Sequence, residues 1–173
     1  INSSYLRNLS KEDFIGRVEP WIGSGAPWSE EKFDSQKFSI MAELIQEKLR
    51  TLSDAPRFVD FLFLDAPDID EISWKKTMKD PQVADSLLGF VAEFFEDCVW
   101  ETDVLKDVGT KAGEKVDLKL GKAQAPLRVA VTGRTVGPPL FETLLDGPKL
   151  RGSFHNRTPS LPVETASELF FIH

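Results

Sequence analysis

Apolar residues recur at intervals of three and four positions through most of this chain, and the strict alternation typical of a β-strand is scarce. This spacing places apolar side chains along one face of an α-helix. Several of these stretches also begin with residues that favour a helix start, such as Asp80 followed by Pro81. The pattern therefore predicts an all-α fold.

In the first part of the chain, the sequence predicts three helices. Ser10 and the acidic residues after it resemble a capping box, and Pro20 is expected to kink or close the helix that follows. Ser29 is expected to cap the second helix. The apolar stripe of that helix consists of Ile40, Met41, Leu44, Ile45, Leu49 and Leu52. Asp54 and Pro56 introduce a short third helix that runs through Leu64.

An acidic, proline-containing segment, residues 65–71, is expected to join two helical subdomains. It lacks the alternating ligands and central glycine of a calcium-binding EF-hand loop, so a linker and capping role is favoured. We therefore expect a first subdomain at residues 1–68 and a second at 69–149. Residues 150–173 form an atypical C-terminal tail with enough apolar content to pack back on the body.

Beyond the joint, the spacing predicts a long helix after Asp80, followed by another that Thr102 caps and that runs to about Gly109. The long helix has one apolar face, made of Leu87, Leu88, Val91, Phe94, Phe95 and Cys98. Because Cys98 continues this face, it is expected to be a buried structural thiol.

The charge distribution argues against a generic nucleic-acid binder, because the formal net charge is -7. The charge is uneven, however: residues 106–134 contain seven basic residues against three acidic ones. Such a stretch is either a solvated face or a local binding footprint for an anion. Charge alone does not decide between these interpretations.

Composition excludes several classes of protein. One cysteine rules out an intramolecular disulfide framework and a cysteine-rich zinc site, and the two histidines, His155 and His173, both lie near the C-terminus. No metal or cofactor site is expected in this chain. No apolar run approaches the roughly 20 residues that span a bilayer. The chain starts at Ile1 without a signal-peptide pattern, so we expect a piece of a longer, cytoplasmic protein with no membrane partner.

Residues 121–142 carry the most informative motif. Pro126 is expected to start a short helix and Gly133 to end it. Arg128 would then lie in the first turn, where free N–H groups and the helix dipole favour an anion such as a phosphate. A cation gains nothing from that position, so the placement indicates function rather than stability.

A stiff turn at residues 137–139 follows this helix and is expected to project Leu140 and Phe141. An apolar side chain beside an arginine is a suitable platform for an unstacked RNA base. We assign that role to Leu140, and we expect Phe141 to belong to the core.

The motif Pro-Leu-Arg-Val-Ala-Val-Thr-Gly-Arg, followed by Gly-Pro-Pro-Leu-Phe-Glu, resembles the C-terminal anticodon-binding region of bacterial-type glutamyl-tRNA synthetases. The first seven residues and residues 45–52 resemble two further segments of that region, in the same order. The resemblance implies an all-α fold whose second subdomain is an α-helix cage. It also implies that the chain grips the anticodon loop of tRNA(Glu).

The resemblance implies which residues contact the anticodon. These are Arg128, Gly137, Pro138 and Leu140, with Arg134 as a further candidate from the same motif. Lys48 stands where the family carries an arginine, so it keeps the charge but loses the bidentate guanidinium.

The catalytic signatures of class I synthetases, "HIGH" and "KMSKS", are absent from this sequence. The resemblance therefore implies that ATP and Mg²⁺ serve a catalytic domain elsewhere in the parent enzyme, and that this piece is an inactive, monomeric binding module. An alternative is a helical protein-interaction domain that keeps the fold without RNA recognition. A hydrolase is disfavoured because no histidine stands near a candidate nucleophile.

Overall fold

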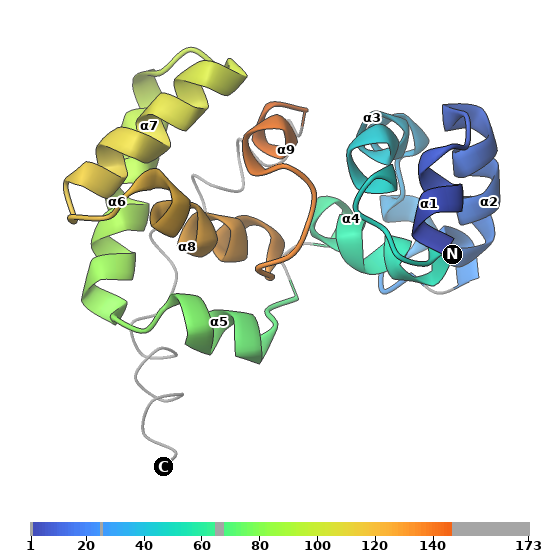
Figure 1. The fold of residues 1–173 in the computed structure, drawn as a ribbon, viewed down its shortest axis with the longest axis horizontal. Coiled ribbons are helices and arrows are strands. Elements are labelled where there is room, and N and C mark those ends of the chain that lie inside the picture. Colours follow the sequence, from blue (N-terminus) through green and yellow to red (C-terminus); the bar gives the residue numbers. More distant parts are fainter. Residues whose placement is uncertain (1, 25, 65–67, 147–173) are drawn as a thin grey trace.

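A computed structural model describes residues 2–24, 26–64 and 68–146, and Figure 1 shows its ribbon. Within these ranges every regular element is helical, as the sequence predicts. The α-helices are α1 (Asn2–Arg7), α2 (Lys11–Ser24), α3 (Ser35–Gln46), α4 (Ala55–Phe63), α5 (Glu71–Thr77), α6 (Pro81–Asp97), α7 (Thr102–Glu114), α8 (Leu120–Thr132) and α9 (Leu140–Asp146). Two short 3₁₀ helices are η1 (Glu30–Lys32) and η2 (Leu52–Asp54).

The helices form two groups (Figure 1): α1–α4 lie together, and α5–α8 lie together beside them. Helix α9 lies between the groups and packs against both α3 and α7. Helix α8 contacts α4 as well as α5, which gives a second connection. The expected boundary between residues 68 and 69 adjoins residues outside the described ranges and stays a prediction, and the expected tail at 150–173 lies wholly outside them.

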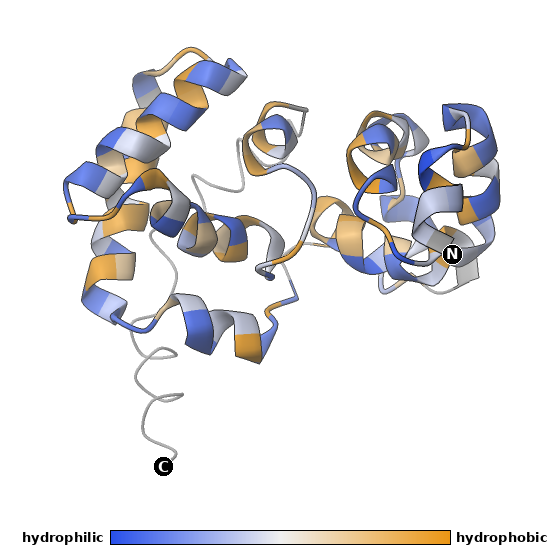
Figure 2. Cartoon of the chain, in the orientation of Figure 1, coloured by the Kyte–Doolittle hydropathy of each residue, from blue (hydrophilic) through white to orange (hydrophobic). Residues whose placement is uncertain are grey.

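The core of the first group forms where α4 meets α2 and α3. Figure 2 shows α4 as mostly hydrophobic, and its buried residues include Val59, Phe61 and Phe63. The ring of Phe63 lies 4.9 Å from that of Trp28 and 5.2 Å from that of Phe33, measured between centroids. These contacts close the segment around η1 over the core, because paired aromatic rings bury large apolar areas.

Two expectations for the first group are wrong. Of the two effects expected of Pro20, closing the helix is wrong, because Pro20 lies inside α2 and does not end it. Ser29 precedes only η1 and makes no side-chain cap, whereas Asp34 caps α3 by accepting from the N–H groups of Gln36 and Lys37. Because α3 starts at Ser35, its buried stripe includes Met41 and continues to Ile45, whereas Ile40 is 46% exposed.

The second group confirms the strongest start signal. Asp80 accepts hydrogen bonds from the N–H groups of Gln82 and Val83, and Pro81 is the first residue of α6. Helix α7 begins at Thr102, after Glu101, and continues past Gly109 to Glu114. Gly109 does not end the helix: a Cβ there would lie 3.2 Å from Cζ of Phe141, so glycine lets α9 approach α7. Cys98 is half-buried at the end of α6, not fully buried.

Candidate nucleic-acid interface

The helix that carries Arg128 is longer than the sequence predicts. Helix α8 begins at Leu120, and Pro126 lies inside it. Arg128 therefore lies in the C-terminal half of α8, and the free N–H groups of the helix start are at the opposite end. The predicted anion site at a helix N-terminus is wrong. The predicted end is confirmed, because Gly133 caps α8 in the left-handed conformation.

The position of the Arg128 side chain is instead set by the turn that follows α8. Its Nη1 donates a hydrogen bond to the carbonyl of Pro138. The side chain is half-buried, and this burial lowers the pKa of Arg128, while the nearby Glu142 carboxylate opposes the shift. Within the described chain Nε and Nη2 have no hydrogen-bond partner, and neither is a buried unpaired atom. The hydrogen bond from Nη1 thus fixes the orientation of the guanidinium, and the N–H groups of Nε and Nη2 can donate to a ligand.

The turn after α8 is held to helix α5 by its backbone. The N–H of Asp70 donates to the carbonyl of Gly133 at 3.0 Å, and the N–H of Thr135 donates to Oγ of Ser73 at 3.2 Å. A Cβ on Gly133 would lie 2.1 Å from the carbonyl oxygen of Asp68. The backbone can therefore pass this close only at a glycine.

Arg134 is held within the fold by charged and backbone partners. Its Nη1 lies 2.8 Å from Oδ2 of Asp60, its Nη2 lies 2.9 Å from Oδ2 of Asp68, and Nη1 also donates to the carbonyl of Arg57. Its Nε is buried without a partner. Both Nη atoms of Arg134 are engaged and its Nε is covered, so these contacts stabilise the fold, and an RNA contact at Arg134 stays a prediction.

The turn at residues 137–139 does not project an apolar tip. Leu140 is 3% exposed, and Pro138 is also buried, so neither side chain can stack on a base. Phe141 is 5% exposed, which confirms that it belongs to the core. Gly137 lies beside Arg128, because a Cβ there would be 3.8 Å from Nη1 of that arginine.

Sequence reasoning missed the exposed apolar residue of this turn. Val136 is 69% exposed and directly precedes Gly137. An apolar residue between a polar residue and a glycine in a turn was the available signal. The structure therefore brings together Arg128, Gly137 and the carbonyl of Pro138, with Val136 beside them.

Lys48 lies in the other group of helices, in the turn that leads from α3 to η2. Its side chain is exposed and has no ion pair within the described ranges. The backbone of this turn is anchored, because Nε of Arg7 donates to the carbonyl of Glu47 at 3.1 Å. The buried Gln46 amide also donates to the carbonyls of Leu6 and Leu9. Helix α1 thus positions Lys48, which the sequence did not indicate.

The basic stretch at 106–134 is partly a solvated face. Lys111 pairs with Asp107 at 2.7 Å, one helical turn away on α7, and both side chains are more than half exposed.

Across the described residues no group of three His, Cys, Asp or Glu side chains could hold a metal ion. In the same residues, no helix has the length and apolar character needed to cross a membrane.

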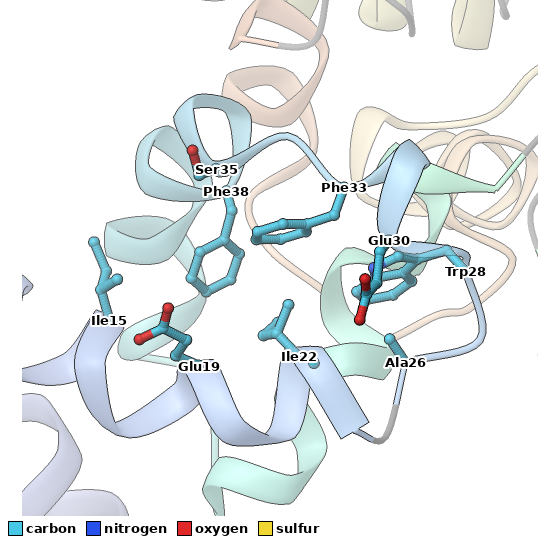
Figure 3. Close-up of a pocket in the computed structure, with 10 residues that line it drawn as sticks. Ile15, Glu19, Ile22, Ala26, Trp28, Glu30, Phe33, Ser35 and Phe38 are labelled. Atoms are coloured by element: carbon cyan, nitrogen blue, oxygen red, sulfur yellow. The ribbon is translucent and has the colours of Figure 1, made fainter.

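Figure 3 shows an apolar pocket of about 290 Å³ between α2 and the segment that leads into α3. Ile22, Trp28 and Phe38 point into it, and the carboxylates of Glu19 and Glu30 lie around them. The lining contains no lysine or arginine. This pocket is therefore unsuited to a phosphate.

Comparisons with known proteins give a consistent result. The family model described as "Anticodon binding domain" matches residues 13–145. Proteins named glutamate–tRNA ligase from Frankia alni and Thermobifida fusca are 47% and 49% identical over 144 and 146 residues. Each match covers 83% of this chain, which spans only about 30% of each relative's length.

Solved structures share the fold. The crystal structure of a glutamate tRNA ligase from Elizabethkingia meningosepticum matches with a TM-score of 0.65 at 22% identity, over 92% of this chain and 31% of that one. A glutamate-tRNA synthetase from Elizabethkingia anophelis matches with a TM-score of 0.55, over 91% and 30% of the two chains. The family model covers well over half of the chain, so this chain belongs to the anticodon-binding domain family.

Proposed function

We propose that this chain binds the anticodon loop of tRNA(Glu) as the anticodon-binding portion of a glutamate–tRNA ligase. The observation that carries the proposal is the state of Arg128, a half-buried guanidinium held by the Pro138 carbonyl with donors left free. A desolvated guanidinium interacts strongly with a base edge or a phosphate oxygen. Gly137 leaves space beside it for an RNA backbone or base to approach.

Pro138 and the first residue of α9 act through the backbone in this proposal. The side chains of Pro138 and Leu140 are buried, so they shape the turn and do not stack on a base. Lys48 adds a charged contact from the turn after α3. A lysine there provides a point charge, so we expect weaker discrimination of the third anticodon base than an arginine would give.

The parent enzyme, in this proposal, attaches glutamate with a separate catalytic domain that uses ATP and Mg²⁺. The share of the relatives' length that this chain spans, about 30%, leaves room for such a domain. The protein acts in the cytoplasm, where translation takes place, and this chain is monomeric. The two subdomains, at 1–68 and 69–149, hold opposite sides of the anticodon loop.

The test is a fluorescence-anisotropy titration of a labelled tRNA(Glu) anticodon stem-loop with the wild-type chain, Arg128→Ala and Arg128→Lys at fixed salt. We expect Arg128→Ala to weaken binding by about 1–3 kcal/mol, because one specific polar contact is lost. Arg128→Lys should recover part of the lost affinity, because lysine keeps the positive charge but lacks the bidentate geometry of a guanidinium. Arg17→Ala is the matched control, since Arg17 is an exposed arginine on α2 that lies over the ring of Tyr5.

A second candidate function, a protein-interaction domain, is favoured by the pocket in Figure 3, where apolar side chains lie among carboxylates. Such a pocket suits a basic, amphipathic peptide. If this function alone applies, Arg128→Ala leaves the weak binding of every hairpin unchanged, and Glu19→Gln with Glu30→Gln weakens the binding of a basic peptide.

A further inference from the structure

A second cavity, which we name the lateral cleft, lies beside the turn that follows α8. Its walls include Arg57 and Phe58 of α4, Ile72 and Lys76 of α5, and Val136 of the turn. Its volume is about 380 Å³, within the usual range for small-ligand sites of about 300–1,000 Å³. Since α4 and α5 belong to different groups of helices, the cleft is formed where the two groups meet.

The cleft lining carries two exposed basic side chains. Arg57 and Lys76 are exposed, and within the described residues neither side chain forms an ion pair. Two carboxylates also line the cleft, and the charge of Arg57 helps to lower the pKa of one of them, Asp70. Asp54 accepts hydrogen bonds from the N–H and hydroxyl of Thr51, and Asp70 accepts from the N–H of Ser73. The lining therefore holds three basic side chains, with Arg134 included, against two carboxylates.

The same cleft has an exposed apolar surface. Ile72 of α5 is 78% exposed, and Val136 of the turn after α8 is 69% exposed. The hydroxyls of Ser73 and Thr135, which also line the cleft, lie 3.2 Å apart. Exposed apolar side chains beside exposed basic side chains suit a nucleotide, which has a flat base and a charged phosphate.

The walls are held in place by the contacts that hold the turn. Arg134 bonds the carbonyl of Arg57, and the N–H of Thr135 bonds Ser73 on α5. Val136 directly precedes Gly137, so the cleft opens next to the residues assigned to anticodon binding.

We propose that the lateral cleft binds one unpaired nucleotide of the RNA loop, with its base against Ile72 and Val136 and its phosphate between Arg57 and Lys76. This inference rests on the proposed function and adds a second subsite to it. It predicts that the affinity for the loop depends on two separate sets of residues, one around Arg128 and one in the cleft.

The experiment uses the whole chain and the labelled anticodon stem-loop. Arg57→Gln with Lys76→Gln should weaken binding about tenfold and lower the slope of log K against log salt by about 0.7, the value for one phosphate contact on a single strand. Ile72→Ser with Val136→Ser should weaken binding by about five- to tenfold through lost stacking. Lys75→Gln is the control, because Lys75 is exposed on the same helix, outside the cleft lining, and pairs with Glu71.

Hairpins with a single abasic nucleotide identify the bound base. One abasic substitution should weaken wild-type binding and cause no further loss in the Ile72→Ser, Val136→Ser variant. Thermal melts of all variants check that the exposed substitutions leave the fold intact.

Two results would overturn the inference. If the cleft variants bind the hairpin like the wild type while Arg128→Ala weakens it, the cleft is not a subsite and the proposed function stands. If the cleft variants lose affinity for an acidic polyglutamate peptide but not for the hairpin, the cleft is a peptide site. If the proposed function itself is wrong, the result is different: the affinity for the hairpin changes neither with Arg128→Ala nor with the sequence of the loop.

Discussion

Nη1 of Arg134 lies 3.0 Å from Oδ1 and 2.8 Å from Oδ2 of Asp60, so a single guanidinium nitrogen contacts both oxygens of a carboxylate that is 2% exposed. This pair joins the turn after α8 to the buried face of α4. The pair crosses between the two groups of helices, and Arg134 also lines the lateral cleft. The residue with the strongest charge pairing in the turn therefore has a structural role, and Arg128 is left as the arginine that can face RNA.

A substitution at Arg134 tests how much this pair contributes to stability. Arg134→Ala should reduce the free energy of unfolding by about 3–5 kcal/mol, because it leaves a buried carboxylate without its partner. Urea denaturation followed by tryptophan fluorescence measures the change. Asp68→Asn is the control: the Asp68 side chain is 72% exposed, so removing its charge should cost no more than about 1 kcal/mol. Equal effects of the two substitutions would contradict the structural role of the buried pair.

The cost of Arg134→Ala should also depend on pH. Burial raises the pKa of Asp60, and the charge of Arg134 opposes that shift. A carboxyl group with a raised folded-state pKa stabilises the fold most below its unfolded pKa of about 3.9, and loses that contribution as the pH rises through the folded pKa. Without Arg134 the pKa rises further, so the deficit of the variant should grow as the pH rises from about 4 to 7. A deficit that stays constant across this range would show that Asp60 does not titrate as described.

Two capping carboxylates have the opposite pH dependence. The N–H of Lys37 lowers the pKa of Asp34, and hydrogen bonds from Ser73 lower the pKa of Asp70. Their stabilising contribution is present above the unfolded pKa and is lost as the pH falls through the lowered folded pKa. Asparagine caps a helix about as well without titrating. Asp34→Asn with Asp70→Asn should therefore flatten the acid limb of the stability curve, as thermal melts between pH 2 and 5 would detect.

A substitution at Gly133 tests the backbone conformation of the turn after α8. Its φ is +77°, and an added Cβ would lie 2.1 Å from a backbone oxygen. Gly133→Ala should lower stability by about 2 kcal/mol or more. Gly16→Ala is the matched control, because Gly16 lies inside α2 with open space around it, and there alanine should stabilise by about 0.5–1 kcal/mol. A harmless Gly133→Ala would mean that the turn after α8 is built differently.

A substitution at Gly137 distinguishes an effect on RNA binding from an effect on stability. A Cβ there would make only ordinary contacts, at 3.8 Å from Nη1 of Arg128 and 3.9 Å from Oγ1 of Thr132. Gly137→Ala should leave the melting temperature unchanged and weaken hairpin binding about tenfold, since the methyl group occupies space that the RNA uses. Gly121→Ala, in open space on α8, should leave hairpin binding unchanged. Unchanged binding in Gly137→Ala would place the RNA elsewhere.

Local signals in the sequence predicted the fold better than they predicted the site. Asp80 and Pro81 mark the start of α6 because a cap depends on residues within one turn. Gly109 looked like a helix end, but its role is to admit Phe141, which lies far along the chain. Pro126 looked like a helix start, but packing keeps it inside α8.

The parts of the site that escaped prediction depend on long-range contacts. Arg134 and Asp60 are 74 residues apart in the chain, so no local pattern connects them. The lateral cleft likewise combines α4, α5 and the turn after α8. The prediction that Arg128 faces a ligand stands on new grounds, because the Pro138 carbonyl, and not a helix N-terminus, orients it.

The most direct test of the central claim compares two hairpins that share one stem and differ only in the anticodon. The dissociation constants of the wild-type chain for the tRNA(Glu) loop and for the scrambled loop are measured at the same salt concentration. Our account predicts tighter binding of the correct loop by about tenfold or more, with the difference removed by Arg128→Ala. Equal affinities for the two loops in the wild-type chain would contradict it.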